Sequence, residues 1–186
     1  MPTVFSVSST TVTTAESTAS RTLTLLLRLS MAWVFLYAAS HQVLVPGWSV
    51  AGFLNSTKTF HWLFGPMTAP VPAAILTVLV EYGHLLIGLS LLTGLLVRLS
   101  SILGIFIMLV YWLAHMDFPY IGDTTNFLLD EHIVYALVLG TLIARHAGHI
   151  WGLDAWAARL EPVHNHKYLH GRKCSSRALY LSVSSQ

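Results

Sequence analysis

Four apolar stretches divide the chain, separated by short polar or aromatic-rich segments. They run over residues 22–45, 71–95, 100–115 and 126–146. Each is close to or above the roughly 20 residues that carry an α-helix across the hydrocarbon core of a bilayer. Runs such as LLIGLSLLTGLL do not alternate, as the strands of a closed barrel would. The pattern therefore predicts an all-α fold, an integral membrane four-helix bundle.

The composition agrees with a membrane setting. Of the 186 residues, 54% are hydrophobic and 10% are charged, whereas about 25% of the residues in soluble domains are charged. The first partner that the sequence predicts is therefore the lipid bilayer.

The segments around the apolar stretches divide the chain further. Residues 1–20 are rich in Ser and Thr and predict a disordered leader before a bundle over residues 21–147. The long connection 46–70 contains several aromatic residues and few charges, so we expect an interfacial segment on the outer side. Residues 148–186 begin with a short amphipathic stretch and continue as a basic, His-containing tail. The tail histidines lack acidic or thiol partners, which favours a solvated or partner-docked tail over a metal site.

The cations predict the orientation. Four spans place nine of them on one side of the membrane, against Lys58 alone on the other. The nine are Arg21, Arg28, Arg98, Arg145, Arg159, Lys167, Arg172, Lys173 and Arg177. The positive-inside rule then predicts cytoplasmic N- and C-termini in an inner (cytoplasmic) membrane. The placement of the cations on the cytoplasmic side explains the excess of basic residues, so we expect no nucleic-acid partner.

The outer connection 46–70 allows two interpretations. Its segment VAGFLNSTKTFHWLFGP suits a short helix in the outer headgroup region. Such a helix either roofs a cavity or serves only as a membrane-anchored connector.

The second apolar stretch carries Glu81 and His84 one helical turn apart, near the depth where a bilayer is driest. Ionisable groups at that depth are costly, so they indicate a functional site. On each of the other stretches, aromatic and ionisable residues recur at helical spacing and form a stripe along one face of the helix. We expect all these stripes to face the bundle interior. The resulting candidate catalytic residues are Glu81, His84 and His132. The candidate cofactor-binding residues are Trp33, Tyr37, His41, Tyr111 and Tyr135.

Buried carboxyl and imidazole groups of this kind suit quinone chemistry. A quinone accepts hydrogen bonds from His or Tyr, stacks on aromatic rings and takes up two protons with two electrons. Quinone is therefore the cofactor that the pattern favours. The alternative is that Glu81 and His84 only join helices through interhelical hydrogen bonds.

A metal centre is the competing chemical interpretation. Glu81 and His84 have the i, i+3 spacing of di-metal sites in ferritin-like bundles, but such a site needs a second Glu-x-x-His. Glu131 and His132 are adjacent and point about 100° apart, so they do not copy this geometry. We therefore expect no metal ligands among the candidate residues.

Several motifs carry a family resemblance. The sequences VEYGHLLIGLSLLTGLLVRLS and DEHIVYALVLGTLIARHAGHIWGLDAW resemble the DoxX/DoxD family, which includes the membrane subunit of thiosulfate:quinone oxidoreductase. The resemblance runs from about Arg21 to Leu160 and implies a four-helix membrane bundle in quinone-linked or redox-linked work. Members often carry a Gly-x-x-Lys-like element at the end of the first span, where this chain reads Ala39-Ser40-His41-Gln42.

Two functions remain open at this level. The chain is either the membrane subunit of a quinone-linked oxidoreductase that oxidises thiosulfate or a similar small substrate, or a non-catalytic accessory or scaffold subunit of a larger membrane complex. The sequence has no flavin, haem-attachment or iron–sulfur motif. The first function therefore requires partners, which are other membrane or redox subunits, or further copies of the chain.

Overall fold

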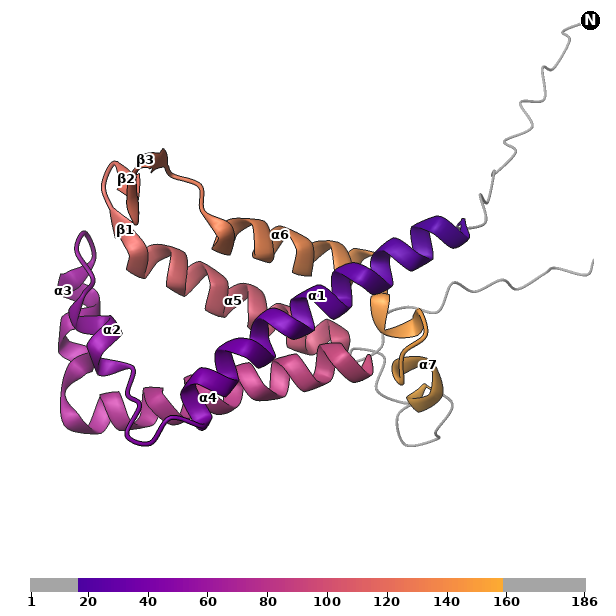
Figure 1. Cartoon of the computed structure of the whole chain (residues 1–186), viewed down its shortest axis with the longest axis horizontal. Helices are drawn as coiled ribbons and strands as arrows, with labels where there is room; N and C mark the ends of the chain where they lie inside the picture. The colour runs from indigo at the N-terminus through magenta and orange to yellow at the C-terminus, as the bar shows by residue number, and fades with distance from the viewer. Residues whose placement is uncertain (1–16, 159–186) are drawn as a thin grey trace, which may run out of the picture.

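The computed structural model describes residues 17–158 (Figure 1). Its helices are α1 (Thr18–Val43), α2 (Ala51–Asn55), α3 (His61–Phe64), η1 (Gly65–Thr68), α4 (Pro70–Thr93), α5 (Val97–His115), α6 (Glu131–Ala144), η2 (Ala147–His149) and α7 (Asp154–Ala157). The predicted leader lies outside the described residues except for Ser17 to Ser20, which cap and begin α1. The predicted tail lies outside them from residue 159 onward.

Each of the four predicted apolar stretches contains one helix. Within the described residues, α1, α4 and α5 are long and apolar enough to cross a membrane, with 26, 24 and 19 residues. The fourth helix, α6, has 14 residues, or about 21 Å at 1.5 Å per residue. It begins at Glu131 and not at 126, because the Asp130 carboxylate accepts hydrogen bonds from the backbone N–H groups of His132 and Ile133 and caps the helix there.

The connection between α5 and α6 corrects the all-α prediction locally. It forms three short antiparallel strands, β1 (Met116–Asp117), β2 (Tyr120–Ile121) and β3 (Asp123–Phe127), in the order β1-β2-β3. Gly122, at a φ of +62°, turns the chain between the last two. The pairing is too short and too local to appear as a hydrophobic period.

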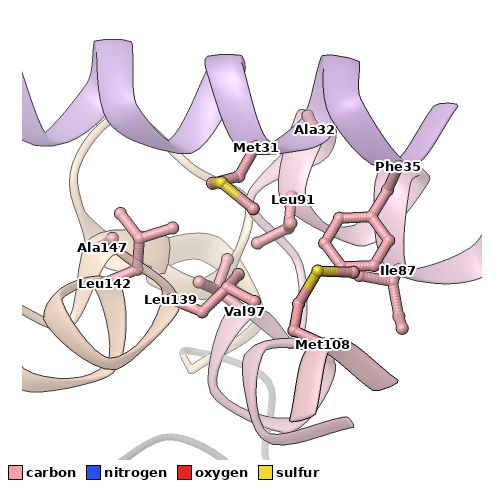
Figure 2. Close-up of a cluster of buried hydrophobic side chains, with 10 residues drawn as sticks. All are labelled: Met31, Ala32, Phe35, Ile87, Leu91, Val97, Met108, Leu139, Leu142 and Ala147. Atoms are coloured by element: carbon pink, nitrogen blue, oxygen red, sulfur yellow. The ribbon is translucent and has the colours of Figure 1, made fainter. Parts of the chain in front are cut away.

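The core lies where α1, α4, α5 and α6 meet. Figure 2 shows its buried side chains converging beneath α1. They are Met31, Ala32, Phe35, Ile87, Leu91, Val97, Met108, Leu139, Leu142 and Ala147. All four predicted helices therefore contribute to one interior.

Glycines on α4 and α5 allow close contacts between the helices. A Cβ at Gly88 of α4 would lie 2.7 Å from Leu36 of α1, and one at Gly104 of α5 would lie 2.9 Å from Leu139 of α6. The glycines therefore admit large side chains of α1 and α6, whereas Gly83 has no neighbour closer than 3.8 Å.

A buried arginine joins α1 to the C-terminal turn at the end of the bundle away from α2 and α3. Arg28 is 2% exposed, and its guanidinium donates to the carbonyls of Ala147, Ile150 and Trp151 at 2.7, 2.9 and 3.4 Å. In the sequence analysis Arg28 was one of the cations that predict the orientation. In the structure it also holds two segments of the fold together. The carbonyls that it binds follow α6, and that of Ala147 also accepts from the Ile150 backbone N–H.

Asp154 completes this arrangement from α7. Its carboxylate accepts from the backbone N–H groups of Leu96 and Val97 at 2.7 and 3.2 Å, at the start of α5. The first N–H groups of a helix lack intrahelical partners, and a negative charge there is favourable. The same carboxylate attracts the Arg28 guanidinium. We call Arg28, Asp154 and the three glycines Gly94, Gly148 and Gly152 packed around them the arginine clamp.

The glycines of the arginine clamp leave no space for a side chain. A Cβ at Gly152 would lie 2.3 Å from the Gly148 carbonyl oxygen and 2.9 Å from that of Gly94. Both neighbours are backbone atoms, which do not move aside by a rotamer change. The close approach brings the turn after α6 onto the end of α4, where Asp154 N donates to Gly94 O.

We predict that Gly152→Ala lowers the free energy of unfolding by about 1–3 kcal/mol, the usual cost of overpacking. Gly140→Ala is the matched control, because nothing lies within 4 Å of the added Cβ and alanine favours a helix interior. Thermal unfolding in detergent should show a lower Tm for the first variant and an equal or higher one for the second. Equal Tm values in both variants would contradict the role of the arginine clamp.

Candidate functional site

A pocket of about 280 Å³ lies at the opposite end of the bundle, beneath the connection that carries α2. Its lining comes from α1, α4, α5, α6 and the connection between α1 and α4. The lining residues are Ala38, Gln42, Trp48, Val50, Phe53, His84, Tyr111, His115 and His132. Three imidazoles, a phenol and an amide thus share one space.

His84 lies deepest and is held in one tautomer. It is 2% exposed, and its Nδ1 lies 2.8 Å from the Val80 carbonyl oxygen and 3.0 Å from Gln42 Oε1. Because the carbonyl only accepts, Nδ1 of the neutral ring carries the proton and Nε2 keeps the lone pair. The ring therefore offers a proton acceptor within a largely apolar setting.

Tyr111 connects His84 to the histidines at the end of α5 and the start of α6. Its ring lies nearly parallel to that of His84, with centroids 5.7 Å apart and planes at 13°. Its side chain is within hydrogen-bonding reach of Gln42. On the other side its ring meets His132 at 5.7 Å in an edge-to-face arrangement. Tyr111 thus lies between the two imidazoles.

His132 and His115 form a second group with Asp130. His132 Nδ1 lies 2.7 Å from Asp130 Oδ2, and His115 Nδ1 lies 2.8 Å from the Tyr111 carbonyl oxygen. The two imidazole rings stack, with centroids 5.0 Å apart. We call His115, Asp130 and His132 the histidine–aspartate cluster.

The connection 46–70 covers the pocket, which decides between its two interpretations. Phe53 of α2 meets Tyr111 edge to face at 5.3 Å and lies 5.1 Å from the His115 ring. The Val50 N–H donates to Thr77 Oγ1 at 3.2 Å and fixes the start of α2 over α4. The connection is therefore a roof as well as a link between spans.

The predicted stripe on α1 faces outward, which corrects its expected orientation. Trp33 and Tyr37 are 67% and 55% exposed, and His41 is exposed and lies against Tyr37, with ring centroids 4.4 Å apart. The face of α1 that packs inward carries Ala32, Phe35 and other core residues, because small and apolar side chains allow the closest approach to α4. Trp33 lies about 160° around the helix from Phe35.

Glu81 and Tyr135 occupy intermediate positions. Glu81 is half-buried, one turn before His84, and does not line the pocket. Residues three apart on a helix differ by about 60° in direction, enough to separate the two side chains. Tyr135 is partly buried and packs against the hydrophobic core. The structure thus brings His84, Tyr111 and His132 together at the pocket, and leaves Glu81, Tyr135 and the α1 stripe outside it.

Six of the nine lining residues were not among the sequence candidates, and two of these, Gln42 and His115, carry hydrogen-bonding groups of the site. Gln42 shares the Nδ1 proton of His84, and its only signal was its place in Ala39-Ser40-His41-Gln42, where the family resemblance implied a lysine. His115 stands at the end of the third apolar stretch, and it joins the site only through the packing of α5 against α6. Neither signal identifies a pocket without the helix packing.

We predict that Phe53→Ala opens the pocket. A cysteine at the lining position Ala38, in a Cys174→Ser background, should then react several-fold faster with a polar thiol reagent. Trp62→Ala is the control, since Trp62 lies on α3 of the same connection, is 73% exposed and does not line the pocket. An equal rate in the parent and in both variants would show that Phe53 is no barrier.

Comparison with known proteins adds the family. The DoxX family model matches residues 23–116, from α1 through α5, and this range includes Gln42, His84 and Tyr111. His132 and Asp130 lie beyond the match. Searches among curated proteins and among solved structures found no match. The apolar helices of the chain are those of a membrane protein. Because the family model covers half of the chain, this chain is a member of the DoxX family.

Proposed function

We propose that the chain is the membrane subunit of a quinone-linked oxidoreductase, with the quinone head group bound at the pocket beneath α2. The supporting observation is the convergence of His84, Tyr111 and His132 from three helices on one pocket. The volume of about 280 Å³ is near the lower end for ligand sites. It suits a single-ring head group whose tail continues into the bilayer.

The side chains match what a quinone ring requires. Tyr111 and Phe53 offer aromatic surfaces at right angles to each other, against which a flat ring packs. The phenol of Tyr111 and the amide of Gln42 are hydrogen-bond donors for the quinone carbonyls. The site is therefore both apolar enough to hold the ring and polar enough to orient it.

Proton transfer is the chemistry that we assign to the histidines. Reduction of a quinone to a quinol takes two electrons and two protons, one for each carbonyl oxygen. His132, paired with Asp130, lies nearer the outer connections and relays protons, and His84 lies at the inner wall of the pocket. We assign no proton step to Glu81, because it lies outside the lining.

The electrons come from a partner subunit in this proposal. The sequence contains no motif for an electron-storing group, so the chain itself supplies the quinone site. Oxidation of two thiosulfate ions to one tetrathionate releases the two electrons that one quinone requires. Thiosulfate, or a similar small substrate, is therefore the reductant that we propose for the complex.

A second candidate function rests on the outward face of α1. Trp33, Tyr37 and His41 form a continuous exposed stripe of rings. Such a stripe suits contact with another helix in the membrane as well as with lipid. It favours a non-catalytic accessory or scaffold subunit if the pocket proves to bind no quinone.

We further propose that α6 is a fourth span, and that both termini lie in the cytoplasm of an inner-membrane protein. The cation distribution supports this orientation. The length of α6, about 21 Å, is below the roughly 30 Å of a hydrocarbon core, so local thinning of the bilayer must accompany it.

Cysteine labelling in whole cells tests this topology. The native Cys174 should react only after the membrane is made permeable, because four spans place it in the cytoplasm. Ser56→Cys in a Cys174→Ser background should react with a membrane-impermeant reagent in intact cells, since Ser56 is exposed next to α2. Labelling of Cys174 in intact cells would mean that α6 does not cross.

The quinone site is tested with membranes that contain the complex. We expect His84→Ala and Tyr111→Phe to lower the co-purified quinone and to reduce thiosulfate-dependent quinone reduction. The decrease for His84→Ala should approach the 10²–10⁴-fold that general acid–base groups contribute. Rates are normalised to the amount of assembled complex, so that a folding defect is not counted as lost chemistry.

Two further variants sharpen this test. His41→Ala is the matched control, because His41 lies at the same end of the bundle and outside the pocket. Glu81→Gln should leave turnover close to that of the parent. A loss of turnover equal to that of His84→Ala would mean that Glu81 takes part in the chemistry of the site. Unchanged quinone content and turnover in both pocket variants would favour the scaffold function.

A further inference from the structure

The histidine–aspartate cluster contains more polar groups than the proposed quinone chemistry uses. His115 lies at the C-terminal end of α5, and Asp130 and His132 lie at the start of α6. One ligand atom from each residue lies within 4.8 Å of the other two. His115 is exposed and the other two are partly buried, so the group is accessible from the pocket region without being fully solvated.

The three residues place their ligand atoms close together. His115 Nδ1 lies 2.8 Å from a backbone carbonyl oxygen, which fixes the proton there and leaves Nε2 with its lone pair. Histidines that bind metals usually donate their other ring N–H in this way, because this fixes the tautomer and the ring direction. His132 Nδ1 and Asp130 Oδ2 lie 2.7 Å apart, so an ion that replaces the proton between them is bound by both atoms.

A purely structural role explains only part of this arrangement. Capping of α6 uses Asp130 Oδ1, and the hydrogen bond with His132 Nδ1 uses Oδ2. Neither requires His115, yet the His115 ring stacks on that of His132 with centroids 5.0 Å apart and planes at 27°. Helix capping therefore leaves the position of His115 beside His132 unexplained.

We propose that the histidine–aspartate cluster binds a divalent first-row transition metal ion through His115, His132 and Asp130. Two imidazole nitrogens and one carboxylate oxygen suit Zn²⁺ or Fe²⁺ and leave further positions for water or substrate. Mg²⁺ and Ca²⁺ prefer sites made of oxygen alone. The proposal shares His132 and Asp130 with the proposed quinone site, but its test is metal binding and does not depend on quinone chemistry.

The distances require only small adjustments. Two donors about 2.1 Å from a tetrahedral ion lie about 3.4 Å apart. The 2.7 Å between His132 Nδ1 and Asp130 Oδ2 therefore has to open by under an ångström if both atoms coordinate. His115 is exposed at the end of its helix, so rotation of its side chain brings its nitrogen from the 4.8 Å limit into range.

Zn²⁺ binding to the purified full-length protein tests this site. The parent for the experiment carries Asn in place of His164, His166 and His170 and has a purification tag without histidine, so that the tail and the tag do not contribute. Titration calorimetry should show one Zn²⁺ per chain that Mg²⁺ does not displace. Co²⁺ in the same protein should produce the visible absorption of a low-symmetry N/O site.

The variants assign the ligands. His115→Ala and His132→Ala should lose the site, and Asp130→Asn should weaken Zn²⁺ binding at least about tenfold, the lower range for groups that hold or orient ligands. Asparagine caps a helix as well as aspartate does, so α6 is retained, and the metal-free Tm should match the parent's. His41→Ala is the matched control, because His41 is also exposed with Nδ1 bonded to the carbonyl four residues before it.

The outcomes separate cleanly. Zn²⁺ affinity retained in His41→Ala and lost in His115→Ala supports the site. Equal Zn²⁺ affinity in the parent, His115→Ala and Asp130→Asn overturns it, as does displacement of Zn²⁺ by an equal concentration of Mg²⁺. Because the measurement is metal binding, failure of the quinone proposal leaves this result unchanged.

Discussion

The Arg28 guanidinium and the backbone carbonyls that it binds are the interaction on which the rest of the molecule depends. A charged group in a bundle of apolar helices is costly unless it is paired and hydrogen-bonded. Three carbonyls after α6 accept from the Nη1 and Nη2 groups of Arg28, and Asp154 adds the opposite charge, while the Nε group has no hydrogen-bond partner among the described residues. The same Asp154 carboxylate caps α5. This one buried cluster therefore sets the positions of α1, α5 and α7 relative to one another.

The two ends of the bundle divide stability from chemistry. The end with the arginine clamp is closely packed, and its glycines admit no added atom without displacing backbone or the Asp154 side chain. The other end keeps an open pocket, where the imidazoles of His84 and His115 are held by hydrogen bonds to nearby carbonyls and, for His84, to Gln42. Rigid packing at one end allows the other to retain space for a ligand, because the helix directions are already determined.

The pocket brings together two kinds of chemistry in our proposals. His84, Tyr111 and Gln42 lie at the inner wall, where a flat ring and proton exchange are favoured. His115, Asp130 and His132 lie toward the outer connections, where two imidazoles and a carboxylate suit a transition metal. Tyr111 contacts both groups through its ring and its carbonyl oxygen. Occupancy of one site is therefore expected to affect the other through this side chain.

The sequence by itself determined the helices, the apolar surroundings and the family. Hydrophobic length predicts helices well, because the backbone in a membrane must satisfy its own hydrogen bonds. It also identified His84, Tyr111 and His132 as interior groups. The prediction that Trp33 and Tyr37 face the interior was wrong. The spacing of residues shows that they share one face of a helix, but only the packing of neighbouring helices shows where that face points. Only the tertiary structure decided which face of α1 packs inward, that Arg28 binds the turn after α6, and that Gln42 and His115 meet the pocket, since each depends on contacts between segments far apart in the sequence.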